Sequence, residues 1–182
     1  MIYNEVRELC RCDEFYSQLS TYCLLINHFM TPLIFLLAAF GLLFGINRFL
    51  LKEKLSLSFI GRASLAVMLV VTGAAHFTST DLMVEMMPEF LPLKKEIVYL
   101  TGVLELLAVI GLLINSLSKI TAVLLIIFFI AILPANIIGS IKQVNLGGME
   151  MGVMYLIFRI PLQILFIFWA YYFGVRINQQ TL

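Results

Sequence analysis

Hydrophobic residues in this chain are gathered into five long runs, and polar residues are concentrated in the short stretches between them. The runs cover approximately residues 23–48, 56–78, 96–114, 119–141 and 150–174. Each run is close to the roughly 20 apolar residues that an α-helix needs to cross a bilayer. The pattern therefore predicts five transmembrane helices.

The stretches outside these runs differ in character. Residues 1–22 are mixed and polar, and their acidic residues rule out the basic start of a cleavable signal peptide. A loose helical spacing of apolar residues in this segment predicts a short interfacial helix. The connector 79–95 contains Pro88 and Pro92 and is expected to be the longest loop. Tight turns are expected at 115–116 and 147–148.

Composition agrees with a membrane protein. Hydrophobic residues make up 62% of the 182 residues and charged residues 13%, against roughly 45–50% and about 25% in soluble domains. A soluble fold of this size has too little interior to bury so much apolar surface. The net charge of +1 leaves no basic surface for nucleic acid. We therefore predict an all-α, multi-pass membrane protein whose surroundings are the lipid bilayer.

The cysteines do not indicate a redox or metal centre. Cys10, Cys12 and Cys23 are the only cysteines in the sequence, and they form no C-x-x-C motif. Cys10 and Cys12 supply two ligands, whereas structural zinc usually takes four. We predict no metal site.

Basic residues bear on the orientation. Five crossings place the two termini on opposite sides of the membrane. The short connector after the first helix carries Arg48, Lys52 and Lys54, and Arg62 follows just inside the next helix. Short basic connectors face the cytoplasm. Because the C-terminus lies on the same side, we expect it to be cytoplasmic.

Two charged residues lie deep inside the predicted helices. Glu105 and Arg159 are each about nine residues from the same end of the bundle, which corresponds to a depth of about 14 Å. A charge at the centre of a membrane helix costs about 2.5–3.5 kcal/mol on insertion scales and asks for a partner. An ion pair between the third and fifth helices is therefore predicted. It could be structural, fixing the register of the helices, or part of a functional site.

Other polar residues lie on helical faces that also carry small residues, as interfaces between membrane helices do. Pro134 and Pro161 each free a backbone carbonyl near such a residue. We expect these polar groups to meet in one pocket in the half of the bundle nearest the 79–95 connector. The candidate substrate-binding residues are Arg62, His76, Glu105, Asn136, Arg159 and Gln163. Structural alternatives remain open: an interfacial anchor for Arg62, a helix cap for His76 and an interhelical hydrogen bond for Asn136.

Several short motifs occur together in a characteristic order. They are GAAHF at 73–77, MPEFLP at 87–92, YLTGVLE at 99–105, PANI at 134–137 and RIPLQ at 159–163. With Arg62, this set resembles the DoxX and DoxX-like family of small membrane proteins over about residues 57–175. The resemblance implies a four-helix membrane domain at 56–176, preceded by an additional transmembrane helix at 23–48.

The resemblance also implies a setting for the function. Members of the family are associated with thiosulfate oxidation linked to quinone, with oxidative-stress complexes and with resistance to quinone-like compounds. This implies a bacterial cytoplasmic membrane protein that binds a small redox-related molecule such as a quinone, or supports a membrane redox complex. A distant relative is an assembly chaperone, so the alternative is a non-catalytic partner subunit whose polar core is structural. Whether the protein is an enzyme stays open, and a non-enzyme is favoured. A transporter is disfavoured because no inverted repeat is visible.

Overall fold

The computed structural model describes residues 30–177 and confirms the all-helical, multi-pass architecture. Five helices are long and apolar enough to cross a membrane. They are the N-terminal helix Met30–Phe49, α2 (Leu57–Thr78), α4 (Lys94–Leu113), the combined α5 and α6 (Asn115–Ile141), and α7 with its π-helical end (Val153–Arg176). The expected interfacial helix at 1–22 and the three cysteines lie outside the described residues.

Two connections differ from the expected loops and turns. The 79–95 connector contains a short helix, α3 (Thr80–Glu85). This helix forms because Thr80 is buried and its hydroxyl donates to the carbonyl of His76 at 2.7 Å, which turns the chain back at the end of α2. The expected turn at 115–116 lies one residue earlier, because Ile114 alone separates α4 from α5.

The fourth membrane span is broken. Helix α5 covers Asn115–Ala131 and α6 covers Leu133–Ile141, with Ile132 between them. Pro134 lies in the first turn of α6, where a proline is tolerated because its missing N–H would have no helical partner. Beyond α6, the chain passes through a 3₁₀ turn at Met149–Met151 into α7 (Val153–Trp169), which continues as π-helix Ala170–Arg176.

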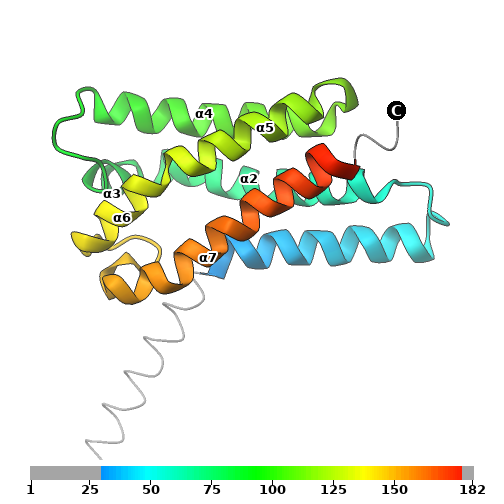
Figure 1. The fold of residues 1–182 in the computed structure, drawn as a ribbon, viewed down its shortest axis with the longest axis horizontal. Helices are drawn as coiled ribbons and strands as arrows, with labels where there is room; N and C mark the ends of the chain where they lie inside the picture. The colour runs from blue at the N-terminus through cyan, green and yellow to red at the C-terminus, as the bar shows by residue number, and fades with distance from the viewer. Residues whose placement is uncertain (1–29, 178–182) are drawn as a thin grey trace, which may run out of the picture.

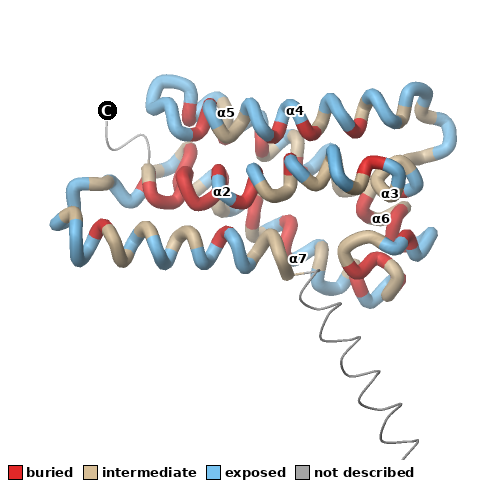
Figure 2. The backbone as a smooth tube through the Cα atoms, turned by 180° about the vertical axis from the view of Figure 1, so that it is seen from behind, coloured by how far each residue is buried: buried red, intermediate tan, exposed pale blue. Residues whose placement is uncertain are grey.

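Helix α2 is the centre of the bundle (Figure 1). Its first half is almost continuously buried, whereas α4 and α5 expose long stretches to the surroundings (Figure 2). The main apolar core forms around α2, with Leu65 and Leu69 packed against Leu112, Phe129 and Phe166. Exposed apolar side chains on the outer helices are expected in a membrane, because lipid tails surround them.

Helices α2 and α4 approach each other closely at a glycine. A Cβ atom at Gly102 would lie 2.7 Å from the Cβ of His76, which is closer than real Cβ contacts come. The glycine therefore allows the two backbones to approach, as small residues do between membrane helices. This close approach is what places His76 of α2 beside Glu105 of α4.

Candidate functional site

A cavity of about 450 Å³ lies in the half of the bundle nearest α3 and α6. Its walls come from α2, α3, α4, the α5–α6 break, α7 and the segments that follow α3 and α6, together with Thr31 and Pro32 of the N-terminal helix. Five of the six residues singled out in the sequence line this cavity: His76, Glu105, Asn136, Arg159 and Gln163. The structure thus brings them together around one space.

Arg62 is not part of this group. Its side chain is buried and donates to the carbonyl of Leu112 at 3.1 Å and to Oδ1 of Asn115 at 2.8 Å. Because Arg62 does not line the cavity, the prediction that it joins the pocket is wrong. The physical reason is depth: Arg62 and His76 share a face of α2, but 14 residues separate them, which is about 21 Å along the helix.

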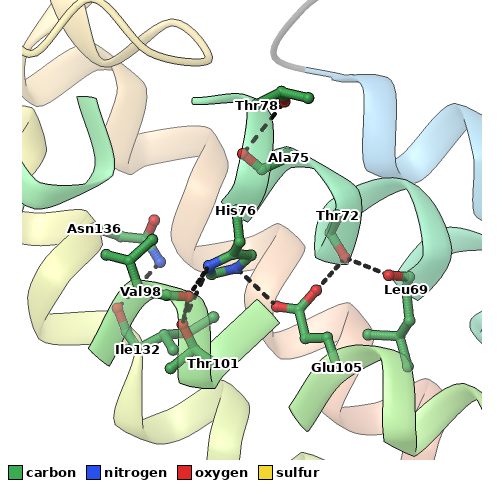
Figure 3. Close-up of polar contacts among 10 residues, drawn as sticks. All are labelled: Leu69, Thr72, Ala75, His76, Thr78, Val98, Thr101, Glu105, Ile132 and Asn136. Atoms are coloured by element: carbon green, nitrogen blue, oxygen red, sulfur yellow. Dashed lines mark hydrogen bonds and ion pairs between the residues drawn. The ribbon is translucent and has the colours of Figure 1, made fainter. Parts of the chain in front are cut away.

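His76 and Glu105 form the best-defined polar contact in the cavity (Figure 3). Nε2 of His76 lies 3.3 Å from Oε1 of Glu105. The other carboxylate oxygen, Oε2, accepts a hydrogen bond from the hydroxyl of Thr72 at 2.6 Å. On the far side of the ring, Nδ1 of His76 lies 3.1 Å from the carbonyl of Val98 and 3.1 Å from Oγ1 of Thr101.

These contacts place a proton between His76 and Glu105. Without a proton between them, a nitrogen lone pair would face a carboxylate oxygen at 3.3 Å, which is repulsive. His76 and both oxygens of Glu105 are therefore engaged with each other and with Thr72 on this wall of the cavity.

The predicted ion pair between Glu105 and Arg159 does not form. Glu105 is engaged by His76 and Thr72 instead. Within residues 30–177, Arg159 has no ion-pair partner. The two residues were placed at equal depth, but α4 packs mainly on α2 and α5, while α7 packs on α6 and its own π-helical end. Glu105 and Arg159 therefore belong to different walls of the cavity.

Helix α7 contributes two polar atoms that are buried and lack a hydrogen-bond partner in the described part of the chain: Nε of Arg159 and Oε1 of Gln163. Gln163 is only 2% exposed, and its Nε2 donates to the carbonyl of Phe129 at 2.7 Å. That carbonyl lies in the last turn of α5, where helix carbonyls have no partner within the helix. The Phe129 contact fixes the amide's orientation and leaves Oε1 as an unused acceptor.

Asn136 satisfies the backbone at the helix break. Its Nδ2 donates to the carbonyl of Ile132 at 3.2 Å, the residue that separates α5 from α6. This is a contact within its own span, so the interhelical hydrogen bond considered for Asn136 is not observed. Asn136 still lines the cavity with its buried side chain.

Much of the remaining wall is apolar and rich in methionine, from Met68, Met83, Met86, Met87 and Met149. Methionine side chains are flexible and polarisable, and they adapt to irregular apolar shapes. Phe129 and Phe166 add aromatic surface. The cavity is therefore suited to a molecule with an apolar body and a polar head.

Sequence reasoning missed Thr72 and the methionines. Thr72 was recognisable, because it precedes His76 by four residues and therefore shares its face of α2. The methionines near 83–87 were visible, but nothing in the sequence placed Met149 beside them.

Residues 30–177 contain no group of three or more His, Cys, Asp or Glu side chains arranged to hold a metal ion. The groups available to a ligand are those of α7, a guanidinium and an amide carbonyl, with His76 and Glu105 on the opposing helices.

Comparison with known proteins gives one match. The model of the family described as "Domain of unknown function (DUF8561)" matches residues 65–174. The matched region includes all five cavity residues and leaves out the N-terminal helix. No curated protein and no solved structure matches the chain.

Proposed function

Since this chain belongs to the family described as "Domain of unknown function (DUF8561)", we propose its function from the cavity: it binds a small amphiphilic molecule within the membrane, such as a quinone. One observation carries the proposal. Arg159 and Gln163 present a buried donor and a buried acceptor, both unpaired in the described chain, to the same cavity. A ligand head that pairs with both atoms would remove the cost of leaving them unsatisfied.

The apolar walls support the same proposal. Small-molecule sites are concave, mostly apolar, and carry a few placed polar groups. Here the methionines and phenylalanines would surround a ring or chain, while α7 would hold a carbonyl or hydroxyl group. A quinone has an apolar body and carbonyl oxygens that would accept from Arg159, and its reduced quinol form has hydroxyls that would donate to Gln163, which makes this couple a suitable first candidate.

The DoxX-like motifs support a proposal for the membrane and the partner with which the protein acts. We propose on their basis that residues 56–176 form a DoxX-like domain, and that the protein acts in a bacterial cytoplasmic membrane beside a redox partner. The basic residues Arg48, Lys52, Lys54, Lys119 and Arg176 lie at the end of the bundle opposite the cavity. By the positive-inside rule that end would be cytoplasmic, which would place the cavity nearer the outer side.

A cavity-filling substitution tests the proposal. Ala135 lines the cavity, so Ala135→Phe should occupy the space that a ligand needs. Ala131 is exposed at the end of α5 and does not line the cavity, so Ala131→Phe is the matched control. Menadione binding to the purified protein in nanodiscs would be measured by equilibrium dialysis, and native mass spectrometry would show what is extracted with the protein.

We expect wild type and Ala131→Phe to bind menadione or to retain a stoichiometric small molecule, and Ala135→Phe to do neither. A folded wild-type protein that carries no small molecule, binds no probe and is extracted with a second polypeptide would contradict the proposal. That result would favour the assembly role, in which the polar residues are architectural.

A further inference from the structure

We propose that the head of the ligand is an anion, paired with Arg159, that also carries a hydroxyl or amide hydrogen, donated to Oε1 of Gln163. This inference rests on the proposed function and adds the chemical class of the ligand. It excludes, as the preferred occupant, a molecule whose head only accepts hydrogen bonds.

The charge follows from the groups that line the cavity. Glu105 is the only acidic residue among the described lining residues. Both of its carboxylate oxygens are already engaged, by His76 and by Thr72. The guanidinium of Arg159 is therefore left without an ion-pair partner in a cavity within the membrane-spanning region.

An uncompensated charge in such a place is unfavourable. Charged residues within membrane helices pair with one another, with carbonyls or with ligands. None of the ion pairs in residues 30–177 involves Arg159. An anionic head would balance the charge, and a guanidinium binds a planar oxyanion through two parallel hydrogen bonds.

The second requirement comes from Gln163. Arg159 and Gln163 are four residues apart on α7 and so lie one above the other on one face. Oε1 of Gln163 can only accept, because the amide is oriented by its donation to Phe129. The head therefore needs a hydrogen donor about one helical turn, roughly 5 Å, from its anionic group.

Four ring-matched probes separate these requirements. The first, 4-hydroxy-2-naphthoate, is an anion with a hydroxyl meta to the carboxylate, roughly 5 Å from the carboxyl carbon as one helical turn requires, and 2-naphthoate is the same anion without it. Methyl 4-hydroxy-2-naphthoate keeps the hydroxyl but is neutral, and menadione is a neutral quinone. Binding of each to the full chain would be measured by equilibrium dialysis in nanodiscs of zwitterionic phospholipid.

We expect 4-hydroxy-2-naphthoate to bind about 10- to 100-fold more tightly than its methyl ester, as a charge-assisted contact implies. Arg159→Gln should remove this preference and leave the affinity for the ester nearly unchanged. Arg159→Lys should keep part of the preference, because the charge remains without the planar fork. Gln163→Leu should reduce the affinity for the hydroxy acid to that of 2-naphthoate.

Arg62→Gln is the matched control, since it removes a buried arginine outside the cavity. It should leave the order of the four probes unchanged. Equal binding of the acid and its ester by wild type would overturn the inference while leaving the proposed function in place. Failure of all four probes, menadione included, would overturn both. An anion preference that survives in Arg159→Gln would assign the charge recognition to another group.

Discussion

The two ends of the bundle treat an arginine within a membrane-spanning helix in opposite ways. At one end Arg62 donates to two backbone carbonyls, those of Ser58 and Leu112, and to the side chain of Asn115. At the other end Arg159 lines a cavity, and its Nε has no hydrogen-bond partner in the described chain. Arg62 thus joins helices to one another, whereas Arg159 keeps a hydrogen-bond donor available for a ligand.

The difference indicates which polar residues are architectural. Arg62 connects α4 to α5, because it binds one carbonyl in the last turn of α4 and the side chain of the first residue of α5. A polar core that only holds helices together is expected to be satisfied in this way. The α7 side of the cavity departs from that expectation, because two of its buried polar atoms have no partner in the described chain. This side is therefore where we expect the ligand to bind.

The largest expected effect on stability is at the end of the bundle where Arg62 is hydrogen-bonded. Arg62→Met should lower the free energy of unfolding by about 2–3 kcal/mol, because a buried carbonyl and the Asn115 side chain lose their partner. Thermal unfolding in detergent, followed by circular dichroism, measures the change. A midpoint equal to that of wild type would show that the Arg62 contacts are not architectural.

A smaller loss is expected where α2 and α4 meet at the cavity wall. Gly102→Ala adds a Cβ where only 2.7 Å is available to the Cβ of His76, and overpacking of this kind costs about 1–3 kcal/mol. Gly41→Ala is the control, because a Cβ there meets nothing within 4 Å. The unfolding midpoint of Gly102→Ala should therefore be lower than that of Gly41→Ala. Equal midpoints would contradict the close approach of α2 and α4.

Glu105→Gln tests the contact between Glu105 and His76. The glutamine amide can donate to Nε2 of His76, so the fold is retained, but the charge-assisted contact is lost, at a cost of about 1 kcal/mol. Glu96→Gln makes the same chemical change at an exposed position in the first turn of α4 and should have almost no effect. Equal stability of the two variants would show that the His76–Glu105 contact contributes little.

The smallest expected change, and the most diagnostic in sign, is at Arg159. Without ligand, Arg159→Met should leave stability within about 1 kcal/mol of wild type or raise it, because Arg159 forms none of the ion pairs in residues 30–177 and its buried Nε has no partner to lose. Chemical denaturation of ligand-free protein measures it. A loss as large as that of Arg62→Met would show that Arg159 is architectural after all.

The sequence determined much of this picture through periodicity. Apolar runs near 20 residues predicted all five spans, and the polar residues inside them identified five residues that line the cavity. The failures share one cause. Glu105 and Arg159 have equal depth but lie on different walls, whereas Arg62 and His76 share a face but differ in depth. Helical periodicity gives a face and a depth, and it does not give the neighbour across the bundle.

The unpaired atoms on α7 also make the stability of the folded protein depend on the concentration of its ligand. A ligand that binds only the folded state stabilises it in proportion to the logarithm of its concentration, by about 2.7 kcal/mol at 100 times its Kd. Because Arg159 and Gln163 gain their missing partners only from outside the described chain, purification that strips small molecules should yield a less stable protein. The melting temperature would then report how much of the cavity's natural occupant each preparation has kept.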